Sequence, residues 1–252
     1  VLATGSTPNK FGWEGEDLDG VQGLVSKQDL ELLEKNTKNC KKAVIIGGGL
    51  IGVELAEMLR TRNIEVTMLV REKAFWHSVL PFDDANMISE HIKSHGVDLR
   101  TATELDKIIP DENGKVISII TKTGEQIDCQ LVGLCAGVHP NIEFLRTSEL
   151  AINRGILVNH YLETNIPDVY AIGDCAEQKK VIGQRKPVEA VWYTGRMMGE
   201  TLALTLTGER SRYNPGNWFN SAKFFDIEYQ TYGWVFSEKK KSSGAREFSN
   251  EQ

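Results

Sequence analysis

The chain has 252 residues, and its 29 basic and 35 acidic side chains give a net charge of −6. This length suits one large domain or two small ones, and the acidic balance argues against nucleic acid as a partner. No apolar run is long enough to span a membrane, so no membrane partner is expected. The first residues lack a secretion signal, which favours a cytoplasmic protein, and the missing initial methionine suggests a piece of a longer chain.

The start of the chain predicts little regular structure. Val1–Ala3 resembles the end of an apolar strand, residues 4–8 break it, and residues 9–23 hold the glycines and acids of a loop. A helix is predicted over Ser26–Lys35, because a serine at its start is followed three residues later by an acid that can complete the cap.

A strand, a glycine-rich turn and a helix form the strongest local pattern. The apolar run 43–46 leads into Gly47, Gly49 and Gly52, and a helical pattern follows over 50–62. This G-x-G-x-x-G spacing is typical of dinucleotide binding: the glycines allow a tight turn, the approach of a pyrophosphate and close helix packing. The N–H groups at the helix start then face the phosphates. A glycine-rich turn in another α/β fold, such as a nucleoside-binding methyltransferase, is the alternative.

The following elements extend this pattern into a sheet. Strands are predicted over 65–70 and 97–100, with a helix over 83–95 between them. The order β-α-β-α-β predicts a parallel sheet with right-handed crossovers.

A meander interrupts this alternation. Short strands over 105–110, 115–121 and 126–130 are joined by glycine-containing hairpin turns, and a buried strand follows over 131–136. The sequence therefore predicts an α/β fold, in which a Rossmann-like parallel sheet carries a three-stranded antiparallel meander.

The second half of the chain predicts shorter elements. Strands are expected over 155–158, 169–172 and 223–233, and a helix over 189–207. The charged, serine-rich tail from residue 238 is expected to be mobile.

Three segments, in their order along the chain, resemble motifs of the pyridine nucleotide-disulfide oxidoreductase family. Residues 1–6 resemble its A-T-G strand, residues 47–56 its nicotinamide-nucleotide fingerprint, and residues 164–176 its second flavin motif. The resemblance extends to about residue 235, and the NAD(P)H-dependent flavoprotein reductases of the rubredoxin-reductase-like or nitrite-reductase-like branch are the most similar. It implies a flavoprotein with two dinucleotide-binding domains.

The resemblance also implies how the chain is divided. Residues 1–23 would end the first FAD-domain segment, 24–140 form the NAD(P)-binding domain, 141–208 form the second FAD-domain segment, and 209–252 form an α+β C-terminal interface segment. In the family, the loop for the ADP half of FAD lies upstream of the first of these segments. The chain is therefore expected to be an N-terminally truncated piece that could lack activity by itself.

The resemblance implies an NAD(P)H site along the first part of the parallel sheet. Its expected residues are Gly47, Gly49, Leu50, Ile51, Gly52, Glu54, Val70, Arg71, Glu72 and Gly137. Backbone N–H groups of Leu50 and Ile51 would hold the pyrophosphate, and Glu54 and Gly137 would lie near the nicotinamide. The alternatives are a helix glutamate favoured by the dipole and a plain strand terminator.

Three consecutive residues after the second strand bear on the choice of cofactor. By the family pattern, Val70 occupies the position where NAD enzymes place an acid. Arg71 could pair with a 2′-phosphate, whereas Glu72 could bind a 2′-hydroxyl. We expect NAD(P)H with a slight preference for NADPH; a solvated loop is the alternative.

A second set of residues is implied for FAD. Its members are Thr4, Gly5, Gly173, Asp174, Glu189, Ala190 and Val191. Asp174 would accept a hydrogen bond from the ribityl chain, and Gly173 would allow close approach. Residues 189–191 would open a helix that points its partial positive charge at the reduced flavin ring.

No catalytic side chain and no metal ligand are expected. The cysteines are widely spaced and predict reduced structural thiols: Cys40, Cys129, Cys135 and Cys175. Four histidines show no metal-ligand spacing: His77, His95, His139 and His160. The cofactors carry the chemistry in this family, and its redox-active cysteine pair, where there is one, lies upstream.

The implied reaction is hydride transfer from NAD(P)H to FAD, with electrons passed on to a redox protein or a small acceptor. Two alternatives stay open. One is a dithiol enzyme of the same family, such as a coenzyme A disulfide reductase, an NADH oxidase or a peroxidase. The other is a nucleotide-binding module without turnover. Aromatic residues in 223–225 would pack in the core, cover the flavin or contact the second subunit of a homodimer.

Overall fold

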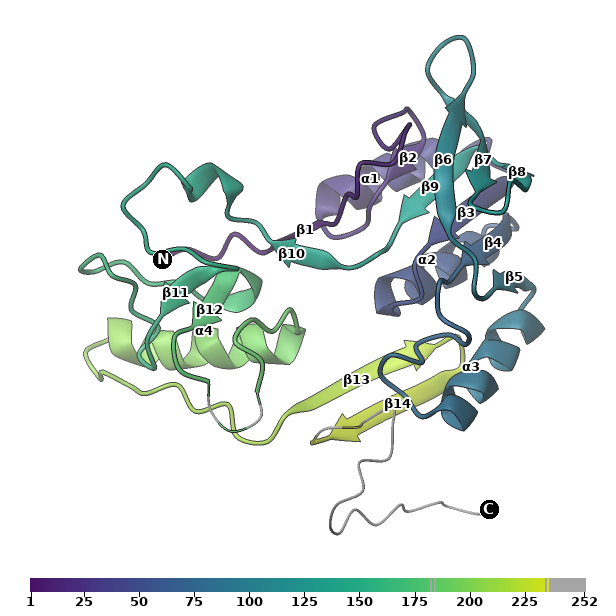
Figure 1. Cartoon of the computed structure of the whole chain (residues 1–252). Helices are drawn as coiled ribbons and strands as arrows, with labels where there is room; N and C mark the ends of the chain where they lie inside the picture. Colours follow the sequence, from purple (N-terminus) through teal and green to yellow (C-terminus); the bar gives the residue numbers. More distant parts are fainter. Residues whose placement is uncertain (182, 184, 234, 236–252) are drawn as a thin grey trace.

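The computed structural model describes residues 1–181, 183, 185–233 and 235, which form two lobes and a C-terminal hairpin (Figure 1). We call residues 13–135 the main lobe and residues 141–208 the small lobe. None of the helices in the described ranges is long and apolar enough to cross a membrane. The tail predicted from residue 238 lies outside these ranges.

A five-stranded parallel sheet forms the middle layer of the main lobe. Its order is β2 (Val21–Gln22), β9 (Leu131–Leu134), β3 (Lys42–Ile46), β4 (Glu65–Leu69) and β5 (Val97–Arg100). Every pair is parallel. The β-α-β-α-β order and the return strand after the meander are therefore confirmed.

Three helices cover one face of this sheet. They are α1 (Lys27–Thr37), α2 (Leu50–Arg60) and α3 (Phe82–Ser94). The predicted cap of α1 is present, since Ser26 and Asp29 form a reciprocal capping box. Apolar side chains of all three helices join one core with the sheet, because their apolar residues recur on one helical face.

The meander covers the other face. It consists of β6 (Leu105–Pro110), β7 (Val116–Thr121) and β8 (Gln126–Asp128), paired antiparallel as predicted. A second core lies between meander and sheet, and it includes Val44 and Ile119. Parallel strands need cover on both faces. The meander therefore buries one face of the sheet, as the helices bury the other.

The small lobe has its own core. It contains η1 (Glu143–Leu145), β11 (Ile156–Val158), η2 (Gly173–Cys175), β12 (Ala176–Gln178) and α4 (Trp192–Leu206). The strand predicted over 169–172 is misplaced. That segment forms only isolated bridges, and the strand that pairs with β11 is β12, which follows it.

A two-stranded ladder connects the lobes (Figure 1). Strand β1 (Ser6–Pro8) pairs antiparallel with β10 (Val138–Pro140). The expectation that residues 4–8 only break a strand is therefore wrong, because a partner far along the chain holds Ser6–Pro8 extended. The strand expected over 1–3 is reduced to one bridge between Leu2 and Ala171.

The C-terminal hairpin returns to the main lobe (Figure 1). Strands β13 (Phe219–Phe224) and β14 (Ile227–Tyr232) replace the single strand predicted over 223–233. The chain reverses at Phe225, whose φ of 58° is unusual for a residue with a side chain. Phe224 and Phe225 are buried in the helix-side core. Core packing, the first of the roles expected for these aromatic residues, is therefore confirmed.

Replacing Phe224 should test how far stability depends on this docking. Phe224 is 0% exposed and packs its ring 5.9 Å from that of Phe75 and 5.4 Å from that of Trp76. We expect Phe224→Ala to lower the free energy of unfolding by about 3–5 kcal/mol, measured by urea denaturation. Phe144→Ala is the matched control, since Phe144 is 62% exposed, and it should change the value by less than about 0.5 kcal/mol. Similar losses in both variants would contradict the docking.

Candidate functional site

Packing explains two of the three glycines after β3. Gly47 has a φ of +121°, and a Cβ there would lie 2.3 Å from the carbonyl oxygen of Cys135. A Cβ on Gly52 would lie 2.7 Å from the carbonyl oxygen of Gly47. Only glycine therefore lets the end of β9, the turn and the first turn of α2 approach this closely.

The second glycine faces open space. A Cβ on Gly49 would meet nothing within 4 Å, and Gly49 is the N-cap of α2 without a side-chain cap. The first N–H groups of a helix have no partner within the helix, and here they belong to Leu50 and Ile51. Room for a ligand and free donors therefore coincide at one helix terminus, which is the geometry that binds phosphate groups.

The residues after β4 divide between the core and the surface. Val70 is 0% exposed, and its side chain packs where a Cβ on Gly48 would lie. Its side chain therefore cannot contact a ribose. The side chain of Arg71 is 78% exposed and that of Glu72 27% exposed, and they form an ion pair with 3.2 Å between Nε and Oε1. The two side chains that were expected to choose between a 2′-phosphate and a 2′-hydroxyl thus form an ion pair with each other.

Glu54 lies on α2, shortly after Gly52. Although the residue is exposed, surrounding protein desolvates its carboxyl and raises its pKa, and the negative charge of Glu57 adds to that rise. Glu57 itself pairs with Lys223 of the hairpin at 3.0 Å. Glu54 has no such ion pair among the residues that the structure describes, so its carboxyl is available to a ligand.

The sequence suggested that Gly137 ends a strand, and the structure shows that it does not. Strand β9 ends at Leu134, and Gly137 lies in the connection to β10 with a φ of +88°. Asn9 holds this connection in place: its backbone N–H donates to the carbonyl oxygen of Gly137 at 3.0 Å, and its side chain donates to that of Ala136 at 3.2 Å. The position therefore belongs to the link between the lobes.

Four of the expected flavin residues lie where the first residues of the chain meet η2: Thr4, Gly5, Gly173 and Asp174. Thr4 Oγ1 donates to the carbonyl oxygen of Asn141 at 2.7 Å, and the Asn141 N–H donates to that of Gly5 at 2.9 Å. Ser6 Oγ donates to Asp174 Oδ2 at 2.9 Å, across 168 residues of sequence. The two flavin motifs are thus hydrogen-bonded to each other. The sequence analysis did not identify Ser6 or Asn141 as site residues. Each forms hydrogen bonds to residues far along the chain, and no local pattern indicates such partners.

Gly173 gives this second site open space. It has a φ of +70°, and a Cβ on it would meet nothing within 4 Å. Behind it, Gly195 of α4 would bring a Cβ within 3.6 Å of the Gly173 Cα. Helix α4 therefore packs closely against one side of η2. The side toward which a Cβ on Gly173 would point stays open, next to Asp174.

The residues before α4 differ from the prediction. Helix α4 begins at Trp192 with Val191 as its N-cap, so Glu189–Val191 precede the helix rather than open it. The Glu189 carboxylate is held by Arg185 at 2.6 Å and by the Thr194 hydroxyl at 3.1 Å. The side chains of Arg185 and Glu189 are only 7% and 6% exposed. Glu189 therefore anchors the approach to the helix through a buried ion pair, which the sequence did not indicate.

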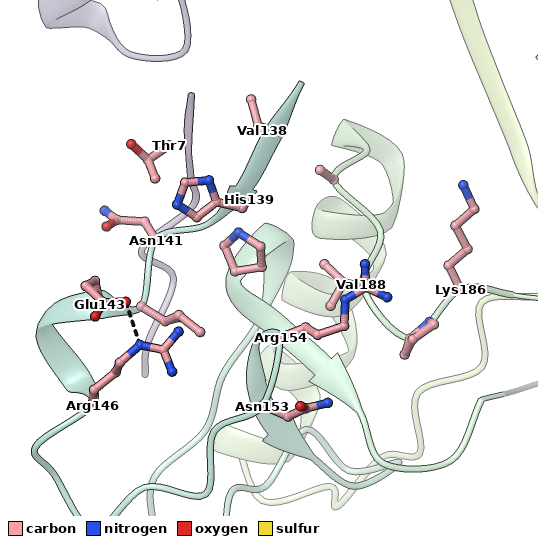
Figure 2. Close-up of a pocket in the computed structure, with 14 residues that line it drawn as sticks. Thr7, Val138, His139, Asn141, Glu143, Arg146, Asn153, Arg154, Lys186 and Val188 are labelled. Atoms are coloured by element: carbon pink, nitrogen blue, oxygen red, sulfur yellow. Dashed lines mark hydrogen bonds and ion pairs between the residues drawn. The ribbon is translucent and has the colours of Figure 1, made fainter. Parts of the chain in front are cut away.

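A cavity of about 820 Å³ opens beside the link between the lobes. Figure 2 shows residues of β10 and η1 on one side and Lys186 and Val188 on the other. Arg146, Arg154 and Lys186 line it with one acid, Glu143. The volume is in the range of cofactor sites, and the lining includes Ala190 of the expected flavin set. Three cationic side chains against one acid favour an anionic group, and the lining includes neither Gly173 nor Asp174.

Comparisons with known proteins agree with this geometry. The model of the family "Pyridine nucleotide-disulphide oxidoreductase" matches residues 1–199. The chain is 30% identical to an NADH oxidase of Methanocaldococcus jannaschii, over 90% of this chain and 51% of the relative. It is also 30% identical to a rubredoxin-NAD(+) reductase of Acinetobacter baylyi, over 81% of this chain and 52% of the relative.

A solved structure supports the same assignment. The ferredoxin reductase of Rhodopseudomonas palustris superposes with a TM-score of 0.84 at 25% identity, covering 93% of this chain and 57% of that one. The chain thus spans about half the length of these relatives. On the glycine loop, the paired flavin motifs and these matches, the chain belongs to the pyridine nucleotide-disulfide oxidoreductase family of NAD(P)H-linked flavoproteins.

Proposed function

We propose that this chain supplies the NAD(P)H site and part of the FAD site of a reductase, in a protein that also carries the family's first FAD-binding segment. The observation that carries the proposal is the pair of open glycines on two lobes. Gly49 faces free helix donors, and Gly173 stands beside Asp174. The β1–β10 ladder fixes the lobes relative to each other.

Each lobe has a separate task in this proposal. In the main lobe, the N–H groups of Leu50 and Ile51 hold the pyrophosphate of NAD(P)H, and Glu54 orients the carboxamide. In the small lobe, Asp174 accepts a hydrogen bond from a ribityl hydroxyl, while Ser6 keeps that carboxylate oriented. FAD held there would supply the hydride acceptor and the means to pass electrons to the next carrier. The protein's contribution is the position and orientation of the cofactors.

The acceptor that we propose is a small redox protein. Two relatives carry names of this kind, a rubredoxin-NAD(+) reductase and a ferredoxin reductase. A putidaredoxin reductase bound to putidaredoxin superposes with a TM-score of 0.81. The second candidate is a thiol-dependent oxidase or reductase, which the NADH oxidase among the relatives favours. In that case the reactive cysteine must lie outside these 252 residues, because the four present are unsuited to the role.

Burial keeps those thiols unreactive. It raises the pKa of both Cys129 and Cys135 to about 12. Burial also raises the pKa of Cys40, while Cys175 is buried in the core of the small lobe. The thiolate is the nucleophile in disulfide chemistry, and at neutral pH almost none is present at Cys129 or Cys135.

Alkylation of the native protein should report this directly. We expect iodoacetamide at pH 8 to leave Cys129, Cys135 and Cys175 unlabelled, with slow labelling confined to half-buried Cys40, as mapped by mass spectrometry. The same treatment in urea should label all four. Rapid native labelling of Cys135 would contradict the proposal and favour a thiol mechanism.

Two glycine substitutions separate ligand binding from folding. Gly49→Ala places a methyl group in open space, so the free energy of unfolding should fall by no more than about 1 kcal/mol. NAD(P)H affinity, measured by nucleotide fluorescence, should nevertheless fall at least about tenfold, because the methyl occupies the path of the pyrophosphate. Gly52→Ala should instead cost about 1–3 kcal/mol of stability through its clash with Gly47. Unchanged affinity in Gly49→Ala would exclude this loop as the binding site.

NADPH is the donor that we propose, with Arg71 as the residue that contacts its 2′-phosphate. Losing one charge-assisted hydrogen bond costs about 1.5–3 kcal/mol, so Arg71→Ala should raise the Kd of NADPH roughly tenfold or more and leave that of NADH nearly unchanged. Glu72→Gln should strengthen NADPH binding, since it frees Arg71 from its ion pair. Fluorescence titration with both nucleotides is the measurement. Equal effects of Arg71→Ala on the two would contradict the assignment.

A further inference from the structure

Two histidines and an aspartate meet where the hairpin contacts α3. His91 and His95 lie one helical turn apart at the end of α3, and Asp226 lies at the tip between β13 and β14. Asp226 Oδ1 is 2.5 Å from His91 Nε2 and 3.5 Å from His95 Nε2. All three ligand atoms lie within 4.8 Å of one another. The sequence analysis did not consider His91, whose spacing to His95 places two imidazoles one helical turn apart.

The hydrogen bonds of His95 identify its free nitrogen. Its Nδ1 lies 3.0 Å from the carbonyl oxygen of His91, which can only accept, so Nδ1 donates. In the neutral ring, Nε2 then carries a lone pair and points toward the carboxylate of Asp226. Such a bond from the second ring nitrogen is how proteins orient a metal-binding histidine. A ring lone pair and a carboxylate oxygen 3.5 Å apart leave a place where one metal ion can bind both.

His91 provides a second, independent observation. Its Nε2 is buried and makes no hydrogen bond of acceptable geometry among the residues that the structure describes, although Asp226 Oδ1 is close. A buried ring nitrogen of this kind normally has a partner. Its position beside both His95 and a carboxylate makes a metal ion a suitable one.

The surrounding rings hold this geometry. The His95 ring stacks on Phe225 with 4.5 Å between centroids, and the His91 and His95 rings are 4.5 Å apart. Phe225 is buried in the core and directly precedes Asp226. Packing therefore positions both histidines and the backbone of the third ligand, and only the 73% exposed Asp226 side chain is free to adjust.

We propose that His91, His95 and Asp226 bind a divalent transition-metal ion of the Zn²⁺ class and fasten the hairpin to α3. Imidazole and carboxylate ligands suit such an ion better than Mg²⁺ or Ca²⁺. Ligands at the usual Zn–N and Zn–O distances in a tetrahedron lie about 3.3–3.6 Å apart. The distance between His95 Nε2 and Asp226 Oδ1 already fits. The distance between His91 Nε2 and Asp226 Oδ1 is shorter, and a rotation of the exposed Asp226 carboxylate can lengthen it into this range. Water completes the coordination.

The site would add a metal link to a contact that includes apolar packing and an ion pair on α2. Phe224 and Phe225 enter the core, and Lys223 pairs with Glu57 of α2. A metal ion bound by Asp226 and the two histidines would hold the tip of the hairpin against the end of α3. Since the ion binds the docked hairpin and not the undocked one, it stabilises docking by mass action.

Zn²⁺ titration into the metal-stripped protein, in competition with a chromophoric chelator, tests the assignment. We expect one site per chain, with the Kd raised at least about tenfold in His91→Ala, His95→Ala and Asp226→Asn. His77→Ala and Glu90→Gln are the controls: His77 lies in the loop before α3 and Glu90 is an exposed acid on the same helix, and neither should change the Kd. The exposed Asp226 side chain keeps Asp226→Asn informative if a histidine variant fails to fold.

Hydrogen exchange gives a second readout that does not depend on enzymatic activity. Zn²⁺ should slow amide exchange in residues 219–232 of the wild-type protein and not in Asp226→Asn. Equal Zn²⁺ affinity in all variants would overturn the site, as would a wild-type protein that binds no Zn²⁺. Specific binding without protection of the hairpin would overturn its proposed role as a fastening.

Discussion

The close approach of the Cys135 carbonyl to Gly47, and of the Gly47 carbonyl to Gly52, is the constraint on which the site depends. These contacts bring the ends of β3 and β9 and the start of α2 together. They leave Gly49 as the one glycine of the motif whose surroundings are open. The N-terminus of α2 therefore points its free N–H groups into space that a pyrophosphate can occupy. The pattern G-x-G-x-x-G thus combines two packing requirements with one vacancy for a ligand.

The same end of the sheet connects to the rest of the molecule. Beyond β9 the chain passes through Gly137 into β10, which pairs with β1. This two-stranded ladder connects the main lobe to the small lobe. There Ser6 reaches Asp174, so a hydrogen bond joins the two flavin motifs next to the ladder. In the proposed function, these links would set the distance and angle between the nicotinamide and the flavin, and orientation is a large part of what a protein adds to cofactor chemistry.

The sequence predicted well where the signal is local. The capped helix at Ser26, the glycine loop and the hairpin turns of the meander each combine periodicity with a specific turn residue, and the parallel sheet followed from their order. Elements that depend on distant partners were missed or misplaced. Strands β1 and β12 are only three residues long, and their partners supply what their own sequences lack. The reversal at Phe225 needs a positive φ at a bulky residue, which no turn rule anticipates.

Residues of the site follow the same division. The glycines and Asp174 come from motifs with a fixed spacing, so the sequence alone could single them out. Ser6 and Arg185 act through partners that only the fold supplies. His91 and His95 share a helical spacing that was readable, but Asp226 joins them only through the docked hairpin. Chemistry that is assembled across elements is therefore the part that sequence patterns predict least.

Anaerobic mixing of NADPH with the FAD-loaded protein, comprising this chain and the family's first FAD-binding segment, tests the central claim most directly. The visible absorbance of the oxidised flavin reports hydride transfer without any assumption about the acceptor. We predict that NADPH bleaches this absorbance rapidly and that one equivalent per flavin suffices. A protein that binds both FAD and NADPH, yet keeps its flavin oxidised in the presence of excess NADPH or NADH, would contradict the claim that these lobes bring the two cofactors together for reaction.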